Sequence, residues 1–338
     1  MAIKIKVRVL LNMKFDKYNE IPKGELHVHL NGLISTKLVK KLIIENNTYV
    51  PHGFCLDKDL NVTIPAKSLA DYLKPWLVLR LIPKSRFDLQ IIIENAFINL
   101  QKENVKFVEL RNTIIYIAKL NNIQLKEALF WIVSDIEYYA DMYNIKAGLI
   151  MTISRSEYSS INLYELLKAY VELGCPKTVI GLDLAGDEDI PISKDTAKVF
   201  MNAKEKYDLG ITIHAGETGS FNNIKDAILH FGADRIGHGT AAIKSAEVIE
   251  LLKSRNICVE VCPISNRLTN AVNRNEIHPV AQMIEYKIPF VLCSDNPSIH
   301  MSSISEDYRY FYSQTNNKKI LNDMYETQKK YSFIEGLK

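Results

Sequence analysis

The sequence predicts an α/β fold, a TIM (β/α)8 barrel with a helical insertion after the first strand. Short apolar, β-branched runs alternate with amphipathic helical segments, and eight such runs occur along the chain. Alternating strands and helices indicate a parallel sheet, and eight repeats of the unit indicate a closed barrel. Polar residues also gather where the predicted strands end, as they do in barrel enzymes.

The predicted strands are short and rich in β-branched residues. They are Glu25–Leu30, Val105–Leu110, Lys146–Ile153, Val179–Leu184, Gly210–His214, Arg235–His238, Ile257–Val261 and Pro289–Cys293. Helical spacing of apolar residues marks the segments between them, among them Phe87–Glu103, Leu125–Tyr143, Ser193–Tyr207 and Ser245–Arg255. The alternative is an open doubly wound sheet, but no G-x-G-x-x-G follows the first strand, which weakens its dinucleotide-binding form.

We expect a single domain, residues 1–338, because this length suits one barrel and no repeat or low-complexity linker occurs. Residues 1–20 form an N-terminal extension, in which alternating Ala2–Leu10 suggests an extra strand. Residues 34–100 are too long for an ordinary crossover. Above the barrel mouth they would form a lid over the site or a packing insertion, and the sequence favours neither.

The composition indicates a globular protein: 47% of residues are hydrophobic, 24% are charged and the net charge is +3. No basic stripe or long apolar run occurs, so neither nucleic acid nor a membrane is an expected partner. The five cysteines form no C-x-x-C pair, and those in or beside predicted strands are interpreted as buried thiols. A reducing, cytoplasmic location is therefore expected. The sequence indicates no oligomeric state.

Histidines at the carboxyl ends of the predicted strands suggest a metal site. His27 and His29 lie two apart on the first strand, so both point into the barrel. His214 and His238 end the fifth and sixth strands, and Asp295 ends the eighth. Three neutral imidazoles and a carboxylate suit Zn²⁺ with an open position for water, although iron or cobalt accept the same donors.

Glu217 follows His214 by three residues and is a candidate proton donor, because a carboxyl group in a dry pocket has a raised pKa. The alternative is a surface glutamate in a loop. Four histidines lack such a context: His52, His230 and His300 are interpreted as loop or surface residues, and His278 as a packing or capping residue near the seventh helix.

Six motifs between residues 22 and 297 resemble, in order, those of the adenosine deaminase family of the amidohydrolase superfamily. They are Pro22–Gly32 (PKGELHVHLNG), Gly181–Glu188 (GLDLAGDE), His214–Glu217 (HAGE), Arg235–Gly239 (RIGHG), Val261–Asn266 (VCPISN) and Ser294–Pro297 (SDNP). The stretch after His29 also looks like the family's N6-methyl-AMP deaminase branch, although that branch often departs from HAGE.

The resemblance implies a hydrolytic deaminase that replaces the 6-amino group of an adenine nucleoside or 5′-mononucleotide by an oxo group. It implies one zinc ion per chain, with ligands His27, His29, His214 and Asp295. Glu217 would protonate purine N1, and His238 would hold the attacking water and help remove its proton. Gly186 would donate its backbone N–H to purine N3. Many family members have a second Asp where this chain has Asn296, whose amide can donate to purine N7.

Asn31 stands where adenosine-specific members usually have an Asp that contacts the ribose. A carboxylate would repel a 5′-phosphate by about 1–4 kcal/mol, whereas an amide can donate to it. Ser35 opens a helix whose N-terminus favours phosphate, or it only caps that helix. The substrate expected is AMP, dAMP or N6-methyl-AMP, with adenosine or deoxyadenosine as the alternative.

Two rival functions remain. One is a different amidohydrolase, such as a metal-dependent phosphoesterase or lactonase; two-metal members often use a lysine on the fourth strand, and Val179–Leu184 has none. The other is a non-catalytic barrel that binds a purine. Retention of Glu217, His238 and all four ligand candidates argues against it.

Overall fold

The computed structural model describes residues 17–337 and is built on eight parallel strands in the order β1 to β8. Their bounds are β1 Lys23–His29, β2 Val105–Asn112, β3 Lys146–Ser154, β4 Val179–Ala185, β5 Gly210–Ala215, β6 Arg235–His238, β7 Cys258–Val261 and β8 Phe290–Leu292. All eight predicted strands are confirmed within two residues at each end. The suggested strand Ala2–Leu10 lies outside the described residues.

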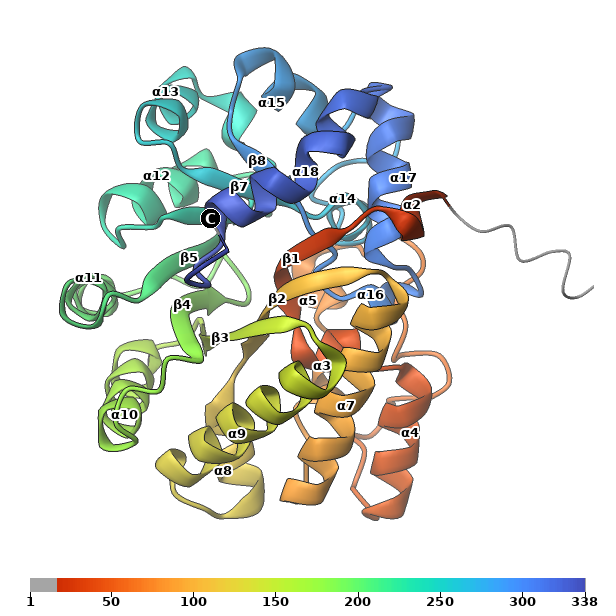
Figure 1. The fold of residues 1–338 in the computed structure, drawn as a ribbon, viewed down its shortest axis with the longest axis vertical. Helices are drawn as coiled ribbons and strands as arrows, with labels where there is room; N and C mark the ends of the chain where they lie inside the picture. Colours follow the sequence, from red (N-terminus) through yellow and green to blue (C-terminus); the bar gives the residue numbers. More distant parts are fainter. Residues whose placement is uncertain (1–16, 338) are drawn as a thin grey trace, which may run out of the picture.

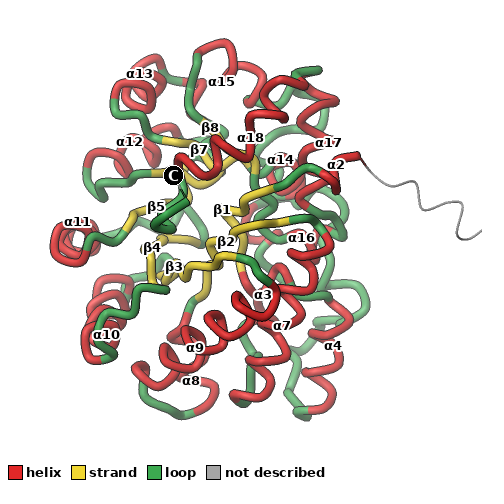
Figure 2. The backbone as a smooth tube through the Cα atoms, in the orientation of Figure 1, coloured by secondary structure: helices red, strands yellow, loops and turns green. Residues whose placement is uncertain are grey.

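Helices surround the strands as an outer ring (Figures 1 and 2), as the TIM barrel prediction requires. The longer ones are α4 Thr36–Glu45, α7 Arg86–Lys102, α8 Ile114–Asn121, α9 Leu125–Tyr143, α10 Ser159–Glu172, α11 Lys194–Tyr207, α12 Phe221–Leu229, α13 Ala246–Ser254, α15 Val280–Tyr286, α17 Ile304–Thr315 and α18 Lys318–Tyr331. The shorter ones are α2 Lys17–Glu20, α3 Leu30–Leu33, α5 Leu69–Tyr72, α6 Trp76–Leu79, α14 Pro263–Leu268, α16 Pro297–His300 and the 3-10 turn η1 Ala242–Lys244.

Serine caps explain where several helices begin. Ser85, Ser193 and Ser245 each stand one residue before a helix and accept a hydrogen bond from a backbone N–H of its first turn. Three of the cysteines are buried, Cys258, Cys262 and Cys293, as the sequence predicts for those in or beside strands. Within residues 17–337, no helix combines the length and apolar character needed to cross a bilayer.

The barrel closes where the first strand meets the chain that follows the last one. The backbone N–H of His29 donates to the Asp295 carbonyl at 3.0 Å, and the N–H of Asp295 donates to the His27 carbonyl at 2.9 Å. Closure therefore brings three of the predicted metal ligands to one point of the backbone.

A group of buried charges fills the barrel interior below this point. Arg235 donates to Glu109 and, at 2.7 Å, to Glu260, while its guanidinium lies 3.6 Å from the centre of the Phe333 ring. Arg111 also donates to Glu260 at 2.7 Å. These arginines and carboxylates are almost completely buried, so each charge depends on its partner.

We predict that Arg235→Met destabilises the protein by about 3–5 kcal/mol, because Glu109 becomes a buried carboxylate without a cation. Urea unfolding followed by circular dichroism measures the change. Lys204→Met is the matched control: it removes the half-exposed partner of Asp234 and should cost about 1 kcal/mol or less. Equal effects of the two substitutions would contradict the role given to the interior ion pair.

Candidate active site

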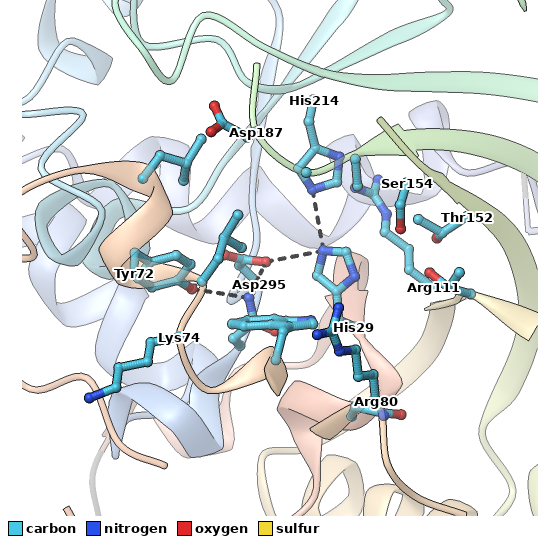
Figure 3. Close-up of a pocket in the computed structure, with 18 of the residues that line it drawn as sticks. His29, Tyr72, Lys74, Arg80, Arg111, Thr152, Ser154, Asp187, His214 and Asp295 are labelled. Atoms are coloured by element: carbon cyan, nitrogen blue, oxygen red, sulfur yellow. Dashed lines mark hydrogen bonds and ion pairs between the residues drawn. The ribbon is translucent and has the colours of Figure 1, made fainter. Parts of the chain in front are cut away.

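Four ligand-type side chains converge at the carboxyl ends of the strands. His27 and His29 come from β1, His214 from β5 and Asp295 follows β8, with one ligand atom of each within 4.8 Å of all the others. The His29 Nε2 atom lies 3.2 Å from His214 Nε2 and 3.4 Å from Asp295 Oδ1 (Figure 3). His27 Nε2 is buried and has no hydrogen-bond partner in the described part of the chain. One cation between these atoms would satisfy all of them.

Carboxylates behind two of the histidines orient their rings. His27 Nδ1 lies 2.7 Å from Glu260, and His214 Nδ1 lies 2.9 Å from Asp183. A ring whose Nδ1–H donates to a carboxylate presents the Nε2 lone pair to a metal, which is the usual arrangement behind zinc-bound histidine. Burial lowers the pKa of His29 to about 3, so the His29 ring is neutral at pH 7. Three imidazole nitrogens and one carboxylate oxygen fit Zn²⁺.

Glu217, in the loop after β5, and His238, the last residue of β6, line the same cavity as this group. Glu217 Oε2 lies 3.7 Å from His238 Nε2, and its Oε1 is buried without a hydrogen-bond partner among residues 17–337. Burial raises the pKa of Glu217 well above its usual value, and the charges of Asp295 and Glu188 raise it further. The raised pKa favours the protonated form of Glu217, which can donate a proton into the pocket.

Glu188 fixes the loop that carries this acid. Its carboxylate accepts the backbone N–H groups of Gly216 and Glu217, each at 2.7 Å, and the Asn223 amide at 2.9 Å. Sequence reasoning noted Glu188 only as part of a strand-end motif. Its burial next to Glu217, which indicates a role in the site, is visible only in the folded structure.

These groups line a cavity of about 520 Å³, a size suited to a nucleotide. Of the predicted site residues, all but His27 and Ser35 line it: His29, Asn31, Gly186, His214, Glu217, His238, Asp295 and Asn296. His27 is fully buried behind the lining. Ser35 is the cap of α4, where its hydroxyl accepts from the Leu38 N–H at 3.3 Å.

The insertion after β1 forms one wall of the cavity through residues 69–82. From this wall the Tyr72 hydroxyl lies 3.3 Å from Asp295 Oδ2 and 2.8 Å from His300 Nε2, and it accepts from the Asn296 amide at 3.1 Å (Figure 3). The interpretation of His300 as a loop or surface residue is wrong, because its ring is buried against Tyr72. Sequence reasoning missed Tyr72, since nothing nearby in the sequence marks it. His52 and His230 are exposed, as predicted.

Asn31 connects the same wall to the barrel. Its amide donates to the Leu79 carbonyl at 2.8 Å, and its oxygen accepts from Asn112 at 3.4 Å. Arg80, which follows Leu79 in the chain, is exposed and lines the cavity on the side of His29 (Figure 3). No hydrogen bond or ion pair involves its side chain within the described residues.

Comparison with known proteins identifies relatives along nearly the whole chain. The model of the adenosine deaminase family matches residues 22–334. An adenosine deaminase of Clostridium perfringens is 30% identical over 300 residues, which cover 88% of this chain and 89% of the relative.

Solved structures share the fold. An N6-mAMP deaminase of Arabidopsis superimposes with a TM-score of 0.80 at 23% identity, over 94% of this chain and 95% of the other. Arabidopsis ADAL complexed with IMP superimposes with a TM-score of 0.80 at 23% sequence identity, over 95% of each chain. An amidohydrolase of Burkholderia ambifaria with bound Zn gives 0.81 at 19%, over 94% and 87% of the two chains.

We predict that Glu188→Gln moves the alkaline fall of kcat/KM to lower pH. We expect the protonated form of Glu217 to be the donor, so activity should fall as pH rises through its pKa, and removal of the Glu188 charge should lower that pKa. Asn223→Ala is the control, because it removes a hydrogen bond to Glu188 but keeps the charge. An alkaline limb that stays in place in Glu188→Gln would show that the charge has no such effect.

Proposed function

Because the chain belongs to the adenosine deaminase family, a family of hydrolases that act on C–N bonds, we propose that it is a zinc-dependent deaminase of an adenine 5′-mononucleotide. The observation that carries the proposal is the arrangement of the cavity. A buried, unpaired carboxyl oxygen of Glu217 faces a cluster of three histidines and one aspartate. We further propose one domain over residues 1–338 and a cytoplasmic location, as the composition and cysteine pattern indicate.

One zinc ion per chain would be held by His27, His29, His214 and Asp295, whose donor atoms suit it. When bound, zinc supplies a nucleophilic water at neutral pH by lowering its pKa to about 7. The zinc in the Burkholderia neighbour supports this choice of metal.

The remaining steps belong to the chain's own side chains. Glu217 donates its proton to purine N1, which makes C6 electrophilic. The water oxygen bonds to C6, the 6-amino nitrogen gains a proton that the water loses, and the C6–N bond breaks to release ammonia or an amine. His238 lies beside the attacking oxygen. Gly186 lines the cavity with φ of +103°, a conformation that favours glycine, and its N–H would reach purine N3. A contact from Asn296 to purine N7 would replace its hydrogen bond to Tyr72.

Arg80 is the group that favours a 5′-monophosphate over a nucleoside. It contributes an unpaired cation to the cavity, whereas the neighbouring Lys74 is paired with Asp59 at 3.0 Å. The neutral Asn31 beside it adds no repulsion. The IMP complex of Arabidopsis ADAL supports a nucleotide in this fold. The phosphate would therefore contact Arg80 rather than Ser35, which lies outside the lining.

We predict that Glu217→Gln retains zinc but loses about 10²–10⁴-fold in kcat, because purine N1 loses its proton donor. Ammonia release gives the rate, and elemental analysis gives the metal content. Near-normal turnover in this variant, with its zinc retained, would refute the role assigned to Glu217.

We predict that Arg80→Gln lowers kcat/KM for AMP by about ten- to a hundredfold, the loss of one charge-assisted hydrogen bond. The same preparation assayed with adenosine is the internal control, and its kcat/KM should stay within about twofold. Asn31→Asp should also lower the ratio of kcat/KM for AMP to kcat/KM for adenosine. Equal losses for both substrates would reject phosphate recognition, and a wild-type enzyme that prefers adenosine would favour the nucleoside alternative.

A further inference from the structure

A buried chain of hydrogen bonds leads from a helix N-terminus to His238. The backbone N–H of Val280 donates to His278 Nδ1 at 3.1 Å. His278 Nε2 lies 3.3 Å from Asn266 Oδ1, and Asn266 Nδ2 lies 3.1 Å from His238 Nδ1. The side chains of His278 and Asn266 are fully buried, and His238 is 2% exposed. The hydrogen bonds between these side chains are therefore shielded from bulk water.

The direction of donation along this series of hydrogen bonds is fixed at its first member. A backbone N–H can only donate, so His278 Nδ1 must accept. Burial lowers the pKa of His278 to about 3, so the ring is neutral and carries its single proton on Nε2. That proton points to Asn266, whose carbonyl oxygen accepts it.

The amide of Asn266 transmits the direction to the active site. With its oxygen occupied by His278, its NH₂ group faces His238 and donates to Nδ1. A flipped amide would require His278 to accept on both nitrogens, which a neutral imidazole cannot do. Because His238 Nδ1 accepts this hydrogen bond, it carries no proton, so the proton of the ring lies on Nε2, the nitrogen that faces Glu217.

We propose that Asn266 and His278 are positioning residues that hold His238 in the Nε2–H tautomer, so that His238 donates a hydrogen bond to the attacking oxygen instead of accepting its proton. The 3.7 Å between His238 Nε2 and Glu217 Oε2 is too long for a direct bond and leaves this proton available to a substrate-side oxygen. The inference departs from the role that family resemblance implies for His238. It rests on the proposed deamination site, but the tautomer is a property of the protein alone.

The tautomer can be read directly from the zinc-loaded protein labelled with ¹⁵N-histidine. Two-bond ¹H–¹⁵N correlation spectra distinguish a protonated ring nitrogen from a bare one, and His238→Gln identifies the signals of His238. We expect a protonated Nε2 and a bare Nδ1. A protonated Nδ1 in the wild-type protein would overturn the inference.

Three variants test whether the hydrogen bonds through His278 and Asn266 set the tautomer of His238. His278→Leu removes the donor to Asn266 and should lower kcat about tenfold with little change in KM, as loss of an orienting partner does. His278→Gln keeps an N–H at that position and should restore most of the rate. Asn266→Asp turns an acceptor toward His238 Nδ1 and should lower kcat by about 10²-fold or more, with the proton moved to Nδ1 in the spectrum.

Tyr308→Phe serves as a control for buried side chains, because it removes a hydroxyl bonded to Gln328 at 3.2 Å without altering this chain. Wild-type kcat and an unchanged His238 spectrum in both His278→Leu and Asn266→Asp would reject the positioning role. A wild-type protein that carries the Nε2 proton but releases no ammonia from any adenine nucleoside or nucleotide would instead reject the proposed function and support the tautomer.

Discussion

The closure of the barrel is the constraint on which the site depends. Two backbone hydrogen bonds join His27 and His29, at the end of β1, to Asp295, which lies three residues after the end of β8. The backbone contact that closes the barrel therefore also sets the separation of three of the four proposed metal ligands. Only His214 must be brought from elsewhere, and it comes from β5 on the other side of the barrel interior. A substitution that disrupted the contact between β1 and Asp295 would displace the proposed metal ligands as well as the strands.

Glu260 links the stability of the barrel to its chemistry. It accepts hydrogen bonds from Arg235, Arg111 and Thr212, and its Oε2 is the partner of His27 Nδ1. Buried charges cost free energy unless each is paired, so the two arginines are needed to keep this carboxylate ionised. Arg111 and Arg235 hold the pKa of Glu260 well below its usual value despite burial, which favours the carboxylate form that orients the His27 ring.

What the sequence predicts well is what repeats or lies close in the chain. Strand bounds follow from short β-branched runs, and His27 and His29 point inward because strands alternate. What it misses depends on segments that meet only after folding. Tyr72 and His300 are 228 residues apart in the sequence but in contact in the fold. Glu260 interrupts the apolar residues of β7, and its partners Arg235 and Arg111 approach it only in the folded barrel. At the start of α4, the structure confirms capping, one of the two roles that the sequence allows for Ser35.

The two positions at which the chain departs from the usual Asp of its family share one physical feature. Asn31 donates an N–H to the Leu79 carbonyl, and Asn296 donates one to the Tyr72 hydroxyl. Both acceptors belong to the insertion wall, and a carboxylate at either position could not donate. The amides therefore hold the wall against the barrel whatever the substrate is, so neutrality at Asn31 alone is weak evidence for a nucleotide. Arg80, which is exposed and lines the cavity without an ion-pair partner among the described residues, is the stronger evidence for a phosphate in this cavity.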